Sequence, residues 1–200
     1  SNKFFRYIIS VIYERYESYV CKKFDFIITA TPTIRDRFLN ILPKKTEAIH
    51  NFPLENEFLI PKNNFSERSY FCYTGGISRI RGGYQMIKSL ELIKSDVQLK
   101  FAGEFWDDTL RNEVKKMKGW NKFDEIGWVD RKKIRKLYSK SLFGICVFLP
   151  TKSHIDSLPN KLFEYLAAGL PVIASNFDNW KKIIETFNCG ICVDPYDTNQ

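Results

Sequence analysis

From residue 70 onward, short apolar runs alternate with segments in which apolar residues recur at the spacing of a helix. The runs predict strands over residues 70–74, 97–102, 123–126, 142–148, 171–174 and 190–193. The segments between them predict helices near residues 84–93, 108–118, 131–139, 159–168 and 179–186. Strict alternation of this kind favours an α/β fold, with a parallel sheet covered by helices on both faces. Such sheets bind ligands at the carboxyl ends of their strands.

The first 42 residues follow a different pattern. Apolar residues at helical spacing predict an amphipathic helix over residues 4–22, and residues 24–29 predict a short buried strand. Thr31 or Thr33 can cap a second helix that extends through Leu42.

Composition supports a folded chain with phosphate-bearing partners. Hydrophobic residues make up 44% of the 200 residues, enough for a core, and the formal net charge is +8. A basic balance suits nucleic acid, nucleotide diphosphates or anionic lipid. The basic residues are spread along the chain, and the run 131–133 on a helix is typical of a solvated face, so nucleic acid is not expected as a partner.

The five cysteines form no disulfide framework, because their number is odd and their spacing irregular. This usage favours a reducing compartment, and we expect a cytoplasmic protein. Cys189 and Cys192 form a lone CxxC, for which ordinary cysteines at a turn and a strand are favoured over a redox pair or zinc ligands. No metal and no cofactor are expected.

A glycine-rich loop follows the strand over residues 70–74. It contains Gly75, Gly76 and Arg81, and its spacing is neither that of a Walker A loop nor GxGxxG. Its backbone N–H groups can cradle phosphate oxygens, and Arg81 can neutralise a diphosphate. A flexible turn with solvated arginines explains the same residues equally well.

The run over residues 156–175, DSLPNKLFEYLAAGLPVIAS, gives a second signal. Ser157 or Asn160 can cap its helix, and Gly169 suits the helix end. The helix start then faces the strand ends, where its free N–H groups favour an anion and Lys161 adds charge. Glu164 lies one turn in, where a carboxylate can accept hydrogen bonds from ribose hydroxyls. The alternative is an amphipathic helix with Glu164 simply solvated.

Several stretches together resemble one known family. Asp156 and Glu164 are separated by seven residues and are followed by AAGLPVIAS, which resembles the E-x7-E region of retaining family 4 glycosyltransferases with the GT-B fold. The stretches 73–76, 101–103, 126–129 and 189–195 are also similar to that family. The resemblance covers about residues 67–197 and implies a Rossmann-like donor-binding domain.

The resemblance also implies roles for individual residues. Glu164 would bind the ribose, and Asp156, one methylene shorter than the usual Glu, would approach the donor sugar. Arg81 would stabilise the leaving diphosphate, so that Arg81, Asp156 and Glu164 form the expected catalytic set. The nucleotide-binding residues that it implies are Gly75, Gly76, Arg79, Gly103, Val129, Asn160, Lys161 and Leu162.

The resemblance implies a domain organisation as well. Residues 1–42 correspond to a remnant of the N-terminal acceptor domain, residues 43–66 to an interdomain linker, and residues 67–200 to a C-terminally truncated donor-binding domain. We therefore expect a chain that binds nucleotide but transfers sugar weakly alone. Apolar surface left on residues 1–42 would promote a homodimer.

The expected function is transfer of a sugar from a UDP- or GDP-type donor to a glycan or lipid-linked acceptor, in surface polysaccharide biosynthesis. The positive charge suits peripheral association with the inner face of a membrane. The alternative is a non-catalytic nucleotide-binding or assembly module of the same fold.

Overall fold

The computed structural model describes residues 3–54, 56–58, 60 and 65–199, and these divide into two compact units. The first unit spans Ser1–Asn51 and the second Phe52–Gln200. This division does not test the functional roles expected for residues 1–42, 43–66 and 67–200, which remain predictions. Residues 55, 59 and 61–64 of the expected linker lie outside the described residues.

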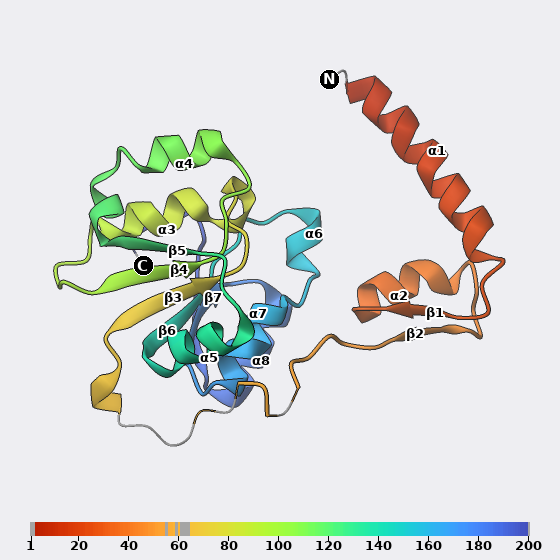
Figure 1. Ribbon diagram of the computed structural model, residues 1–200. Helices are drawn as coiled ribbons and strands as arrows, with labels where there is room; N and C mark the ends of the chain where they lie inside the picture. Colours follow the sequence, from red (N-terminus) through yellow and green to blue (C-terminus); the bar gives the residue numbers. More distant parts are fainter. Residues whose placement is uncertain (1–2, 55, 59, 61–64, 200) are drawn as a thin grey trace. The chain divides into compact units, whose positions relative to one another are not determined.

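The first unit is built from a long helix and a small α/β motif (Figure 1). Its elements are α1 (Lys3–Cys21), β1 (Ile27–Thr29), α2 (Pro32–Leu39) and β2 (Thr46–Ala48), and β1 pairs parallel with β2. Thr31 is the N-cap of α2, where its hydroxyl accepts a hydrogen bond from the backbone of Ile34. The predicted extension of α2 to Leu42 is wrong, because the helix ends at Leu39 and turns lead into β2.

Helix α1 carries apolar side chains around most of its circumference. The exposed ones are Phe4, Phe5, Tyr7, Ile8, Ile9, Ile12, Tyr13, Tyr16 and Tyr19. Among the described residues, no helix is long and apolar enough to cross a membrane.

The second unit contains a six-stranded sheet in the order β5-β4-β3-β6-β7-β8, in which every neighbouring pair is parallel. Its strands are β3 (Tyr70–Thr74), β4 (Gln98–Ala102), β5 (Phe123–Gly127), β6 (Ser141–Cys146), β7 (Val172–Ser175) and β8 (Gly190–Val193). The strand order changes direction at β3, whose neighbours are β4 on one side and β6 on the other. In sheets of this kind the crevice for a ligand opens at that change, outside the carboxyl ends of the strands.

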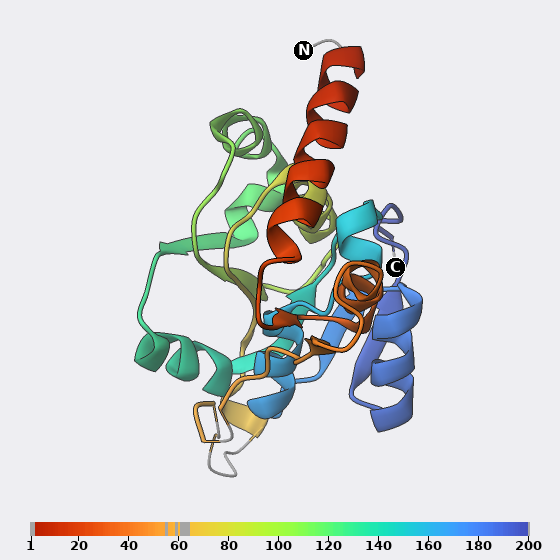
Figure 2. The same ribbon diagram turned by 90° about the vertical axis from the view of Figure 1, so that its right-hand side faces the viewer.

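Helices cover both faces of the sheet, as the sequence predicted. Figures 1 and 2 show α3 and α4 on one face and α5, α7 and α8 on the other. Their bounds are α3 (Gly83–Leu90), α4 (Asp108–Val114), α5 (Arg131–Ser139), α7 (Asn160–Ala167) and α8 (Asp178–Phe187). The short helix α6 (Lys152–Ile155) and the 3-10 helices η1 (Phe65–Glu67), η2 (Arg79–Arg81) and η3 (Lys118–Lys122) lie in the connections.

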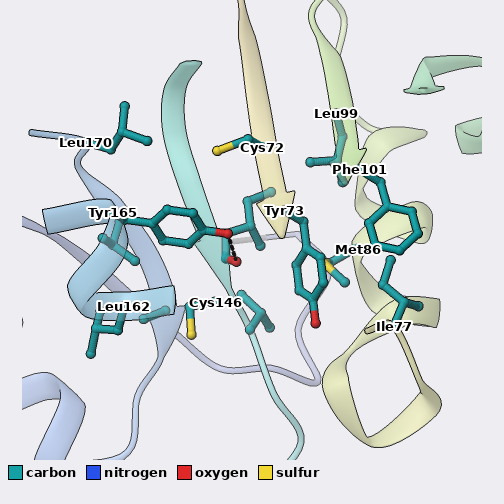
Figure 3. Close-up of a cluster of buried hydrophobic side chains, with 14 of the residues drawn as sticks. Cys72, Tyr73, Ile77, Met86, Leu99, Phe101, Cys146, Leu162, Tyr165 and Leu170 are labelled. Atoms are coloured by element: carbon teal, nitrogen blue, oxygen red, sulfur yellow. Dashed lines mark hydrogen bonds between the residues drawn. The ribbon is translucent and has the colours of Figure 1, made fainter. Parts of the chain in front are cut away.

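The core lies on both faces of the sheet, because successive strand residues point to opposite sides. Figure 3 shows Cys72 directed toward Tyr165 and Leu170, whereas the next residue, Tyr73, lies with Phe101 on the other face. All five side chains are buried. Burial of this kind on both faces explains why the strands read as continuous apolar runs in the sequence.

Several predicted elements differ in length from those observed, and hydrogen bonding explains two of the differences. The strand predicted over residues 142–148 ends at Cys146, because Val147 and Phe148 leave the ladder and Phe148 bonds through both backbone polar groups to the Ser175 hydroxyl. The helix predicted over residues 108–118 ends at Val114, after which turns lead into η3.

Candidate functional site

A cavity of about 730 Å³ opens at the carboxyl ends of β3, β4 and β6, where the strand order changes direction. The loop after β3, the segment after β5 and the start of α7 surround it. Its lining residues are Thr74, Gly75, Arg81, Ala102, Gly103, Trp128, Val129, Asp130, Arg131, Ile134, Phe148, Pro159, Asn160, Lys161 and Glu164.

The loop after β3 brings one of its two arginines to the cavity. The Arg81 guanidinium stacks over the Trp106 ring at 4.0 Å and donates a hydrogen bond to the Gly76 carbonyl at 3.3 Å. Arg79 instead forms an exposed ion pair with Glu113, away from the lining. The loop therefore presents one fixed cation to the cavity, and Arg79 fits the alternative of a solvated arginine.

Close approaches explain two glycines at this edge. A Cβ atom on Gly76 would lie 2.2 Å from the Trp106 ring, so Trp106 occupies the space that a side chain at this position would need. A Cβ atom on Gly103 would lie 2.2 Å from the Gly75 carbonyl oxygen, so the loops after β3 and β4 touch through their backbones. Glycine at both positions lets the two loops close around one end of the cavity.

The start of α7 points free backbone donors toward the cavity. The N-cap residue is Pro159, which has no side-chain donor or acceptor, and within the described chain no side chain caps this helix. The prediction of Ser157 or Asn160 as the cap is wrong, since the Ser157 hydroxyl bonds to the His154 carbonyl and Asn160 is already helical. Gly169 follows the helix with a positive φ of 65°, as predicted for its end. An uncapped N-terminus favours an anion.

Lys161 is buried on the wall of the cavity. The residue is 8% exposed, and its Nζ atom has no hydrogen-bond partner among the residues that the structure describes. Nζ lies 3.4 Å from the centre of the Tyr73 ring and 5.3 Å from that of Phe148. Burial lowers the pKa of Lys161 from its usual 10.5 to about 7, and nearby Arg81 adds to this decrease.

Glu164 is held at both of its carboxylate oxygens. Arg131 donates to Oε1 at 2.6 Å, and the Tyr138 hydroxyl donates to Oε2 at 3.0 Å. The ion pair with Glu164 raises the pKa of Arg131. The Glu164 side chain is only 12% exposed, so the alternative of a simply solvated glutamate is wrong. Each oxygen keeps further lone-pair capacity for a ligand hydroxyl.

A hydrogen-bonded chain fixes this carboxylate to the sheet. The Tyr138 hydroxyl lies 2.9 Å from the hydroxyl of Thr74, the last residue of β3. The backbone of Thr74 donates to the Tyr165 hydroxyl at 3.1 Å. Residues from α5, β3 and α7 therefore define one position for Glu164.

The structure brings seven of the predicted site residues together at the cavity. These are Gly75, Arg81, Gly103, Val129, Asn160, Lys161 and Glu164. The other four lie outside the lining: Gly76 packs under Trp106, Arg79 pairs with Glu113, Leu162 is fully buried in the core, and Asp156 is exposed at the end of α6. Their roles at the site remain predictions.

Sequence reasoning named Trp128 only within the stretch 126–129 and missed Arg131 as a residue of the cavity. Trp128 is 77% exposed, an unusual position for so large an aromatic side chain, and it adjoins the predicted Val129. Arg131 belongs to the basic run assigned to a solvated face, and it is exposed as expected, but it also forms ion pairs with Glu57 and Glu164 that the run did not indicate. No sequence motif pointed to Arg131, because its partners Glu57 and Glu164 are distant in sequence.

The fold, the cavity and the sequence pattern agree with one family. Residues 55–200 match the sequence profile of the glycosyl transferases group 1, and the chain belongs to this family. A parallel sheet with helices on both faces is also the architecture of the GT-B glycosyltransferase structures that it resembles.

Three relatives illustrate the similarity. Spore coat protein SA of Bacillus subtilis is 27% identical over 135 residues, which cover 62% of this chain and 35% of that protein. The structure of Anabaena HepE with UDP-glucose is 14% identical with a TM-score of 0.71, covering 92% of this chain and 54% of that one. Sucrose-phosphate synthase from Thermosynechococcus elongatus is 18% identical with a TM-score of 0.66, covering 92% and 48%. The chain thus spans about a third to a half of the length of these relatives.

Proposed function

We propose that this chain supplies the donor site of a retaining glycosyltransferase that moves a sugar from a nucleoside-diphosphate donor to a hydroxyl of a glycan or lipid-linked acceptor. The observation that carries the proposal is the combination, in one cavity, of the basic side chains Arg81 and Lys161, an uncapped helix N-terminus and a fixed carboxylate. Family membership supports the same reaction class.

The cavity offers a complementary group for each part of such a donor. Arg81, Lys161 and the first N–H groups of α7 suit the diphosphate, because helix N-termini and basic side chains bind phosphate oxygens. Glu164 suits the ribose, since its carboxylate can accept hydrogen bonds from two hydroxyls. Gly103, Trp128 and Val129 would face the base.

The proposed reaction breaks the bond between the sugar C1 atom and the β-phosphate oxygen, and the electron pair stays on that oxygen. C1 then bonds to the acceptor oxygen, and the proton of the acceptor hydroxyl leaves with the nucleoside diphosphate. Charge therefore accumulates on the diphosphate in the transition state. Arg81, which stacks on Trp106, is positioned to offset this charge without first moving into place.

Asp156 is proposed to approach the donor sugar, as the resemblance implies. The retaining outcome, the acceptor and a role in surface polysaccharide biosynthesis are proposed on the same resemblance. We also propose that the protein acts in the cytoplasm at the inner face of a membrane, which the net charge of +8 favours. Anomeric proton couplings in the NMR spectrum of the product would test retention.

The first test is calorimetric titration of the purified chain with UDP and with GDP. One of the two is expected to bind, and Glu164→Gln is expected to weaken that binding at least tenfold, because the amide donates where ribose hydroxyls need an acceptor. Glu185→Gln is a matched control, since Glu185 is exposed on α8 and pairs only loosely with Lys181. Circular dichroism would establish that each variant is folded.

Absence of binding by both nucleotides to a folded chain would overturn the proposal. If Glu164→Gln and Glu185→Gln change the nucleotide affinity equally, Glu164 does not contact the nucleotide. Because UDP and GDP share the ribose and the diphosphate, a difference between them reports on the base alone.

A second candidate function is a non-catalytic nucleotide-binding or assembly module of the same fold. Two observations favour it: Asp156 lies outside the cavity lining, and Gly76 has no side chain to reach a phosphate. Nucleotide binding without hydrolysis or transfer of any offered UDP- or GDP-sugar by the complete protein would support this candidate. Release of nucleoside diphosphate, lost in Arg81→Met, would exclude it.

A further inference from the structure

The cavity contains one side chain whose position is unexplained by the fold alone. Lys161 buries an amine at the start of α7, and burying an amine without a hydrogen-bond partner costs free energy. Within the described part of the chain its Nζ atom makes no hydrogen bond, so the buried donors are unsatisfied. Such a group is expected where a bound ligand completes its surroundings.

The surroundings of Nζ disfavour its charge in the absence of a ligand. The ring faces of Tyr73 and Phe148 attract an ammonium ion through cation–π interactions, but they give its N–H groups no oxygen acceptor and do not replace the lost water. Arg81 contributes a second positive charge from η2, so two cations face the same part of the cavity. Desolvation and like charge both oppose protonation of the amine.

The titratable groups around Nζ come from five elements. Cys72 and Tyr73 of β3 and Cys146 of β6 are buried acids, and burial raises the pKa of each thiol to about 12 and that of Tyr73 above its ordinary range. Glu164 lies one turn along α7, and Arg81 lies in η2. His154 of α6 packs on the far wall, with its ring centre 4.7 Å from that of Phe148, and its Nδ1 atom lies 3.1 Å from the Leu149 carbonyl oxygen.

We infer that Lys161 takes up a proton when a nucleoside diphosphate enters the cavity, and that the resulting ammonium ion binds the diphosphate oxygens together with Arg81. The inference rests on the proposed function and adds a mechanism for it. The four-carbon stem lets Nζ turn from the Tyr73 ring to a phosphate, and two negative charges on the diphosphate reverse the balance that disfavours protonation.

In this arrangement, Arg81 and Lys161 both bind the diphosphate, but they differ in when they carry a charge. Arg81 is charged before the ligand arrives and is held on Trp106. Lys161 becomes charged only with the ligand, which avoids keeping two uncompensated cations close together in a buried site. The consequence is a donor site whose affinity depends on pH near neutrality.

Calorimetry in buffers of different ionisation enthalpy measures the protons taken up on binding. The probes are UDP-glucose and GDP-mannose, because their diphosphates are esterified at both ends and bring no group that titrates near neutrality. With a pKa of about 7 for free Lys161, uptake of about 0.8 proton is expected at pH 7.5 and about 0.1 at pH 6. Affinity is expected to fall above pH 7, approaching tenfold for each pH unit.

Three variants separate Lys161 from the other groups. Lys161→Met should abolish the pH-dependent uptake and weaken binding, whereas Lys161→Arg, charged at every pH used, should bind without uptake. Lys182→Met is the matched control, because Lys182 is exposed on α8, and it should behave as the parent chain. Uptake that persists in Lys161→Met would come from other groups and would overturn the inference.

A second measurement uses the unmodified sequence. In the chain labelled with 13C-lysine, one Cε resonance is expected to titrate near pH 7 without ligand and to stay in its charged position up to pH 9 with ligand. Binding of a probe with uptake below about 0.2 proton at pH 7.5, or a Lys161 resonance that ignores the ligand, would overturn the inference while leaving nucleotide binding intact. Failure of UDP, GDP and both probes to bind would overturn the proposed function as well.

Discussion

At the scale of single residues, Lys161 couples the site to the stability of the fold. Its native pKa of about 7 lies below the usual 10.5, so between these values the unfolded chain binds more protons than the folded chain. Stability contributed by this residue therefore rises with pH above 7 and is lower below it. The upper limit is about 1.4 kcal/mol for each pH unit.

We predict that the free energy of unfolding of the ligand-free chain increases from pH 7 to pH 8.5, relative to Lys161→Met. The comparison between the two chains cancels the titration of groups that both contain. Urea unfolding at closely spaced pH values would measure the difference. A difference that is flat or falls with pH would show that Lys161 keeps its charge in the empty site.

Arg131 is a second residue with a testable role, because it fixes one oxygen of Glu164. Its side chain is 62% exposed, so the ion pair is screened and its loss should cost about 0.5–1 kcal/mol. We predict that Arg131→Ala weakens nucleotide binding about two- to fivefold. Lys132→Ala, on the exposed side of the same helix, should leave affinity unchanged. Equal affinities for all three chains would mean that Tyr138 alone orients the carboxylate.

The sequence could reveal those site residues that stand in short motifs, but not those whose contacts are made with residues distant in sequence. Arg81, Lys161 and Glu164 stand in compact motifs at strand ends, so their convergence follows from the parallel sheet. The interactions of Arg131 depend on Glu57 and Glu164, whose proximity is a tertiary property. Trp106 likewise reaches the site only because Gly76 leaves room for its ring.

At the scale of elements, the sequence predicted the six strands of the second unit and their parallel arrangement. The differences lie where polar contacts override the apolar pattern, as at Phe148, whose backbone turns from the ladder to Ser175. The strand β2 was missed because its three residues, in a segment expected to be a linker, include only one buried side chain. Helix α6 has four residues, too few for a helical period to show.

Helix α1 exposes more apolar surface than an isolated surface helix normally does. A helix that is apolar around most of its surface is normally buried, yet Phe5, Ile9 and Ile12 are all more than half exposed. We predict that the chain self-associates through α1. Sedimentation velocity at tens of micromolar should show a dimer, and Ile12→Glu should dissociate it. Ser10→Glu, on nearly the opposite face of the helix, should leave the dimer intact. A monomer in all three cases would contradict the prediction.

At the scale of the whole molecule, the chain is two units of unequal size, and all residues that line the cavity belong to Phe52–Gln200. We predict that a fragment beginning at residue 52 folds and binds the same nucleotide as the full chain, within about twofold in affinity, because the lining is complete without the first unit. Calorimetry on the fragment and on its Glu164→Gln form would test this. A folded fragment with no affinity would mean that the first unit contributes to the site.

The chain has four tryptophans, and their positions suit detection of nucleotide binding by intrinsic fluorescence. Trp180 is fully buried behind the lining residue Phe148, whereas Trp128 stands exposed at the cavity and Trp106 lies under the Arg81 guanidinium. A nucleotide that covers Trp128 would move the emission of this residue to shorter wavelength or quench it. Occupancy could then be followed optically in real time, without a label and with Trp128→Phe as the blank.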